Sequence, residues 1–129
     1  MPVSYVPAGH NTVSPYLTVR DARGLATFIE KTFDAKTIHF KEMPGGAVHA
    51  ELRVQDSIVM LGQTMPGGEI FPGQIHVYVP SVDETYARAL RAGGTSIRQP
   101  TDMPYGDRIS MVRDPFDNVW AISTHKEDV

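Results

Sequence analysis

Hydrophobic and polar residues alternate along most of the chain, and twice the alternation gives way to a helical pattern. Residues 14–20 alternate, with Leu17 and Val19 on one side, as is typical of a half-buried strand. Asp21 stands where a helix N-cap is needed, and apolar residues at helical spacing follow it. Further alternating segments cover 37–42, 47–54 and 57–61. The first half of the chain therefore predicts a strand, a helix and three more strands.

The same order returns after a connection rich in glycine and proline at 62–73. Residues 75–79 alternate, and Ser81 and Glu84 have the spacing of a capping box at the start of a second helix. The remaining strands are expected at 96–99, 108–113 and 119–124. The repeat predicts an α+β fold of two tandem βαβββ modules, because each module alone leaves one sheet face open and needs the other.

We expect the two modules to form a single domain covering residues 1–129. In this arrangement the modules make a half-barrel around a central cleft, with the helices on the outer face. The expected boundaries are about 12–62 for module one, 63–73 for the linker and 74–125 for module two.

The strand pattern also assigns side chains to the two faces of each sheet. Because helices cover the apolar face, polar side chains of the opposite face point to water or into the cleft. Trp120 falls on the helix-facing side and is expected in the core. The cleft candidates are Ser14, Tyr16, Thr18, His49, Glu51, Arg53, His76, Tyr78, Arg108 and Ser110.

Composition narrows the classes of function. The chain has 129 residues, a formal net charge of −3, 41% apolar and 21% charged residues, which is ordinary for one globular domain. It has no stripe of lysine and arginine, so we expect no nucleic-acid partner. The absence of cysteine excludes a disulfide, a zinc-thiolate site and a thiol nucleophile. Since no signal peptide or long apolar run is present, we expect a cytoplasmic protein without a membrane partner.

In this pattern the chain resembles the vicinal oxygen chelate superfamily, which includes glyoxalases, bleomycin-resistance proteins and extradiol dioxygenases. The duplicated βαβββ plan is the hallmark of that superfamily, and Asp-Pro-Phe-Asp-Asn at 114–118 is similar to its Asp-Pro-x-Gly-Asn turn. Asp34 and Asp117 stand where the family usually has glycine. The fold permits this change because aspartate tolerates the left-handed backbone conformation better than most residues do. A narrower likeness to the PhnB-like branch rests on residues 16–21, 49–52, 105–108 and 120–129. The resemblance implies a homodimer.

The resemblance also implies where a metal would be held. The four ligand positions of the superfamily's metal enzymes fall on Ser14, Glu51, His76 and Ala121. Only Glu51 and His76 have side chains that ligate metals, and Ala121 removes the carboxylate that often accepts a proton. The standard metal chemistries of the superfamily are therefore disfavoured, and no cofactor is expected.

Several roles remain open for the cleft candidates. His49, Glu51 and His76 are a conceivable substitute site for a divalent metal such as zinc, iron or manganese, although hydrogen-bonded polar groups lining a pocket are commoner. Glu51 with His76 is also a candidate acid–base pair without metal. Tyr16 and Tyr78 are candidates for stacking on a planar ligand.

Arg108 has two alternative roles. Its planar fork suits a ligand carboxylate or phosphate. An ion pair with Asp107 or Asp102 is equally compatible with the sequence.

The leading hypothesis is a small-molecule-binding protein that sequesters its ligand. Its predicted ligand-binding residues are Tyr16, Thr18, His49, Tyr78 and Arg108, with Glu51 and His76 as the residues that would be catalytic in an enzyme. The alternative is a metal-dependent lyase or isomerase with a non-standard site made by His49, Glu51 and His76. A third hypothesis is a subunit whose cleft is filled by its own side chains and which acts through protein contacts.

Overall fold

The first module of the computed structural model, which describes residues 3–129, contains one helix and one four-stranded sheet. Its sheet has the order β1-β4-β3-β2, with β1 parallel to β4 and the other neighbours antiparallel. The elements are β1 (Tyr16–Val19), α1 (Ala22–Phe33), β2 (Lys36–Glu42), a 3₁₀ turn (Pro44–Gly46), β3 (Val48–Val54) and β4 (Ser57–Gln63).

The second module repeats this topology. Its sheet has the order β5-β8-β7-β6, again with one parallel pair, β5 and β8. The elements are β5 (Gln74–Tyr78), α2 (Val82–Arg91), β6 (Thr95–Asp102), β7 (Asp107–Arg113) and β8 (Val119–His125). Two open four-stranded sheets with one helix each confirm the predicted α+β fold of tandem βαβββ modules.

Both helices begin at the residues that the sequence predicts. The side chain of Asp21 accepts a hydrogen bond from the backbone N–H of Gly24 at 2.9 Å, and Ser81 accepts one from Glu84 at 3.3 Å. These bonds satisfy donors that the first turn of a helix leaves free. Helix α1 ends at Asp34, which has the left-handed backbone conformation with φ of 54°. Local chemistry therefore determines where each helix starts and where α1 stops.

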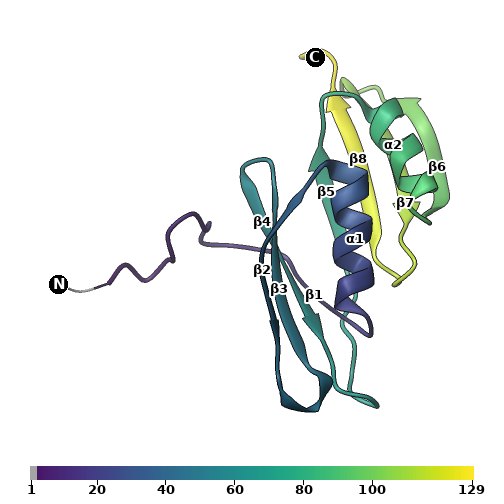
Figure 1. Cartoon of the computed structure of the whole chain (residues 1–129). Coiled ribbons are helices and arrows are strands. Elements are labelled where there is room, and N and C mark those ends of the chain that lie inside the picture. Colours follow the sequence, from purple (N-terminus) through teal and green to yellow (C-terminus); the bar gives the residue numbers. More distant parts are fainter. Residues whose placement is uncertain (1–2) are drawn as a thin grey trace.

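Helix α1 lies between the first sheet and the second module (Figure 1). It packs on β3 and β4 and contacts α2, which in turn packs on β6, β7 and β8. Trp120 of β8 is fully buried, and its ring lies 5.1 Å from that of Phe33 and 6.4 Å from that of Phe28, both of α1. The predicted core position of Trp120 is confirmed, and this aromatic cluster joins the two modules.

Strand β3 shows the predicted division of faces. Val48, Ala50, Leu52 and Val54 are buried under α1, whereas the residues between them are partly exposed on the other side. We call this other side the open face of the first sheet. The equivalent surface of the second sheet, which carries His76, is its open face.

Strand β7 differs from the prediction. Arg108 lies opposite Thr124, and Ser110 lies opposite Ile122, in the rows that face α2. Ser110 is fully buried and donates a hydrogen bond to the backbone oxygen of Ile122 at 3.4 Å. The assignment of Arg108 and Ser110 to the cleft is therefore wrong, because partners near the helix satisfy both polar side chains.

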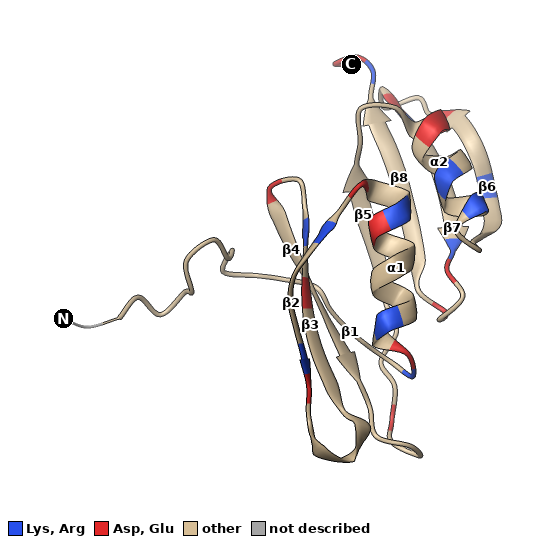
Figure 2. Ribbon diagram, in the orientation of Figure 1, with Lys and Arg blue, Asp and Glu red and all other residues tan. Residues whose placement is uncertain are grey.

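Three strands extend beyond their predicted C-terminal ends. Strand β4 continues to Gln63, β6 covers Thr95–Asp102, and β8 continues to His125. The connection between the modules also pairs briefly with β1, where Thr18 and Phe71 exchange backbone hydrogen bonds of 3.3 and 2.9 Å. Acidic and basic residues are interspersed over both modules (Figure 2). Among residues 3–129 no helix is long and apolar enough to cross a membrane.

Candidate functional site

The open face of the first sheet brings Tyr16, His49 and Glu51 together. Tyr16 of β1 and Glu51 of β3 both lie opposite Met60 of the strand between them, so they share one row of the sheet. His49 lies two residues before Glu51 on the same face. The ring of Tyr16 covers Gly62, where an added Cβ would come within 2.8 Å of the ring. Pairing register therefore places three predicted site residues side by side.

A continuous chain of hydrogen bonds links these side chains. The Tyr16 hydroxyl lies 3.1 Å from Nδ1 of His49, and Nε2 of His49 lies 2.9 Å from one carboxylate oxygen of Glu51. The other oxygen of Glu51 lies 2.7 Å from Nε2 of His10, whose Nδ1 lies 3.2 Å from the backbone oxygen of Ala8. Both oxygens of Glu51 are therefore engaged, each by a different imidazole.

The acceptors in this chain determine where its protons lie. A carbonyl and a carboxylate only accept, so the contacts of His10 suit its protonated form, in which both ring nitrogens donate. Hydrogen bonding to Glu51 raises the pKa of His10 above its ordinary value. The hydrogen bond from His49, with that from His10, lowers the pKa of Glu51 below its ordinary range, against the opposing effect of burial. Glu51 is consequently an anionic carboxylate with only 15% of its side chain exposed.

His10 is the site residue that the sequence prediction missed. It belongs to residues 3–15, an arm that precedes the first strand, projects away from the first sheet (Figure 1) and contacts the open face at His10. The arm has no regular pattern, and the only signal in the sequence is a lone histidine. Its side chain is 14% exposed, because it packs against Glu51 on a strand forty-one residues further along the chain.

The arm and the sheet line an open cavity of about 400 Å³. Glu51 and Met60 belong to its sheet side, and Tyr16 lines its edge with about half of the residue exposed (49%). The volume lies within the range typical of small-molecule sites. The lining residues are Tyr5, Val6, Pro7, His10, Asn11, Thr12, Ser14, Tyr16, Glu51 and Met60.

His76 and Tyr78 form a second group on the open face of the second sheet. Nε2 of His76 lies 3.0 Å from the hydroxyl of Ser123, and the Tyr78 hydroxyl donates to Asp107 at 3.4 Å. Asp107 also accepts from His125 at 2.7 Å, which with Asp128 raises the pKa of the His125 imidazole. His76 and Tyr78 line a separate cavity of about 380 Å³ between the arm, the β3–β4 turn and β5. Within one chain the structure does not bring His76 and Glu51 into the same cavity.

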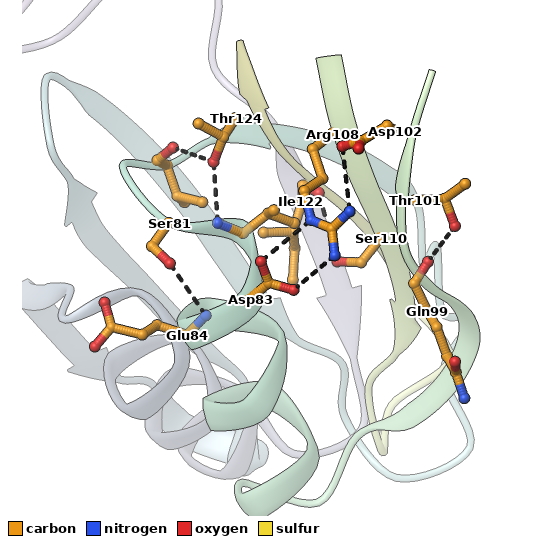
Figure 3. A network of polar contacts seen from close by, with 12 residues as sticks. Ser81, Asp83, Glu84, Gln99, Thr101, Asp102, Arg108, Ser110, Ile122 and Thr124 are labelled. Carbon is orange, nitrogen blue, oxygen red and sulfur yellow. Dashed lines mark hydrogen bonds and ion pairs between the residues drawn. The ribbon is translucent and has the colours of Figure 1, made fainter. Parts of the chain in front are cut away.

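Like His49, the remaining two predicted residues do not line either cavity. Thr18 has its backbone bonded to Phe71 of the connection between the modules. Arg108 binds Asp83 of α2 through Nε and Nη2, both at 3.1 Å, and binds Asp102 through Nη1 at 3.2 Å (Figure 3). These charge-assisted bonds engage the guanidinium on the helix side of β7, so the alternative of an ion pair with Asp102 is confirmed.

The residues present do not fit the metal site of the superfamily. Of the four positions that the resemblance indicates, Ser14 and Ala121 lack an imidazole or carboxylate, and both oxygens of Glu51 already accept hydrogen bonds. His76 lies with Ser123 on the other sheet. Within residues 3–129, no three histidine, aspartate or glutamate side chains are grouped so that they could hold a metal ion.

Comparison with known proteins identifies the family. The family model of the glyoxalase/bleomycin resistance protein/dioxygenase superfamily matches residues 9–122, and the chain belongs to this superfamily. It is similar to the uncharacterized protein Mb0911c of Mycobacterium bovis, with 35% identity over 129 residues that cover 91% of this chain and 85% of that protein.

Solved structures show the same fold. TioX from Micromonospora sp. ML1 aligns with a TM-score of 0.74 and 24% identity, over 89% of this chain and 98% of TioX. A glyoxalase I mutant from Zea mays aligns with a TM-score of 0.75 and 20% identity, over 87% of this chain but 46% of the maize chain. The fold of this chain therefore corresponds to about half of the maize enzyme.

Proposed function

We propose that the chain binds a flat, cationic small molecule in the cavity between the arm and the first sheet. The observation that carries this proposal is an anionic Glu51 at the inner side of a cavity of about 400 Å³ that tyrosine rings line. A carboxylate that is mostly withdrawn from water attracts a cation more strongly than an exposed one does. The rings of Tyr5 and Tyr16 offer aromatic faces to a planar ligand, and such faces also attract cations.

Sequestration is the role that this site supports best. It requires shape, aromatic surface and one opposite charge, and it requires neither a metal nor a catalytic base. The superfamily includes bleomycin-resistance proteins, and membership is compatible with such a role. The segments at 16–21 and 105–108 support assignment to the PhnB-like branch.

We also propose that the working form is a homodimer. Tyr5 of the arm is 92% exposed and Tyr78 on the second sheet is 60% exposed, and contact with a second copy would remove such apolar surface from water. A second copy would also cover the open faces and complete the walls of the cavity. Light scattering after size exclusion tests this part and should give twice the mass of one chain. A monomer at micromolar concentration would contradict it.

Thioflavin T is a suitable probe for the ligand site, because it is flat and carries a permanent positive charge. Its analogue without the N-methyl group is nearly identical in shape but neutral. We expect the cation to bind wild-type protein and Glu51→Gln to weaken that binding about fivefold to tenfold, since one attractive charge pair is lost. The neutral analogue should bind both proteins equally.

The matched control is Glu69→Gln, which removes the same charge from an exposed residue of the connection between the modules. This control should leave thioflavin T affinity unchanged. Fluorescence titration at constant ionic strength provides the dissociation constants. Equal loss of affinity in Glu51→Gln and Glu69→Gln would show that only net charge matters and would contradict the proposed site.

A further inference from the structure

The carboxylate that the proposed ligand needs is already bound by a histidine of the same chain. The imidazole of His10 lies 2.7 Å from Oε1 of Glu51, and its other nitrogen is held by the backbone of the arm at Ala8. His49 holds the second oxygen, and its backbone is fixed in β3 two residues from Glu51, so the sheet keeps it beside the carboxylate. At His10 the arm is neither strand nor helix, so no backbone pairing fixes it to the sheet there. His10 is therefore the partner of Glu51 that a ligand can displace.

We propose that His10 is an internal competitor for the ligand cation, so that the arm acts as a gate whose closing depends on the protonation of His10. The inference rests on the proposed function, because it needs a cationic ligand at Glu51. When the ligand cation enters, the His10 imidazolium leaves Glu51 and the arm moves aside. A neutral ligand cannot replace the charge of His10 at Glu51, so it does not displace the imidazolium. His10 is therefore a residue that determines specificity for cations.

The surroundings of His10 leave Glu51 as the carboxylate that controls its charge. Three residues of β3 lie on the side that His10 faces. Glu51 binds His10 directly, Arg53 is more distant and its charge opposes protonation of His10, and His49 lies beyond the carboxylate. From β1 and β4 the cavity contributes Tyr16 and Met60, and from the arm itself it contributes Tyr5.

Proton linkage gives the sign of the effect. Bonded to Glu51, His10 has a pKa above its ordinary value of 6.5, and once displaced into water it returns toward that value. At a pH between the pKa of displaced His10 and that of bonded His10, ligand binding releases a proton. The affinity for a cation therefore rises with pH over this range. Linkage to one proton limits the rise to about tenfold per pH unit. Because the pair is partly exposed, we expect about fivefold in total.

The experiment measures thioflavin T affinity between about pH 6 and pH 8, a range in which an imidazole titrates and the charge of the dye does not change. Wild-type affinity should increase with pH, and calorimetry in two buffers of different ionisation enthalpy should detect proton release. His10→Ala should bind the dye about fivefold tighter than wild type at the acidic end, with no dependence on pH. His10→Gln keeps a neutral donor and should also lose the pH dependence. His39→Ala is the control, since His39 lies on the same face without a hydrogen bond to Glu51, and it should retain the wild-type slope.

The outcomes separate the gate from the proposed function. Dye binding that depends on Glu51 but is equal in wild type and His10→Ala at every pH would overturn the gate and leave the proposed function standing. A pH dependence that survives in both His10 variants would likewise overturn the gate. Absence of binding in wild type and in His10→Ala would overturn both. Binding to His10→Ala alone would support the gate, with the wild-type arm closed against this dye.

Discussion

Asp114 allows a quantitative test of how the second module is held together. Its carboxylate is 3% exposed and accepts four hydrogen bonds within the turn between β7 and β8. One oxygen accepts from the backbone N–H groups of Phe116 and Asn118, at 2.7 and 3.0 Å. The other accepts from the side-chain amide of Asn118 at 2.9 Å and from the indole of Trp120 at 2.8 Å. The same turn therefore fixes the aromatic ring that joins the modules.

Asp114→Asn changes one atom and should be strongly destabilising. An asparagine amide has one oxygen, so in either orientation its nitrogen faces two donors that then lack an acceptor. Each buried donor without a partner costs about 1–3 kcal/mol, which gives about 4 kcal/mol for two. This is a large part of the roughly 5–15 kcal/mol that stabilises a domain of ordinary size. The melting temperature should fall by roughly 10–20 °C.

Urea unfolding followed by Trp120 fluorescence measures this loss. The control is Asp117→Asn in the same turn, where the side chain is exposed and the backbone is left-handed with φ of 70°. Asparagine tolerates that conformation, so the control should stay within about 0.5 kcal/mol of wild type. A loss below about 1 kcal/mol in Asp114→Asn, with an unchanged slope, would refute the reasoning that all four donors depend on this carboxylate.

Further predictions concern a helix cap, pH and metal. Asp21→Ala should cost about 1 kcal/mol in urea unfolding because the N–H of Gly24 loses its acceptor, whereas Asp21→Asn should be nearly neutral. Stability should be highest between about pH 4.5 and 6.5, the ordinary pKa values of Glu51 and His10. The lowered pKa of Glu51 stabilises the fold above 4.5 and is lost in acid, while the raised pKa values of His10 and His125 stabilise it below 6.5 and are lost as pH rises through them. Urea midpoints across pH check this, and an optimum above pH 7 would contradict it. Dialysis against a chelator should leave thioflavin T affinity unchanged, and recovery of lost affinity on adding zinc or manganese would contradict a metal-free site.

The sequence by itself determined the features that depend on neighbouring residues. Alternation along 47–54 predicted which side chains of β3 are buried, because successive side chains of a strand point to opposite faces. Asp21 and Ser81 predicted the starts of the helices, because a cap is made within one turn of the chain. The repeat of the whole pattern predicted two modules, and Glu51 with His49 and Tyr16 followed from the faces of two strands.

Only the tertiary structure decided which partners these residues meet. Arg108 is polar and was assigned to the cleft, but Asp83 on α2 lies within reach and holds it on the helix side of β7. His10 carries no pattern at all, and a contact across forty-one residues with Glu51 makes it part of the site. His76 and Glu51, both assigned to polar strand faces, line separate cavities on different sheets. Periodicity predicts which face of a sheet a side chain lies on. The charged or hydrogen-bonding partner that it meets there comes from a distant part of the chain, so the sequence pattern does not predict it.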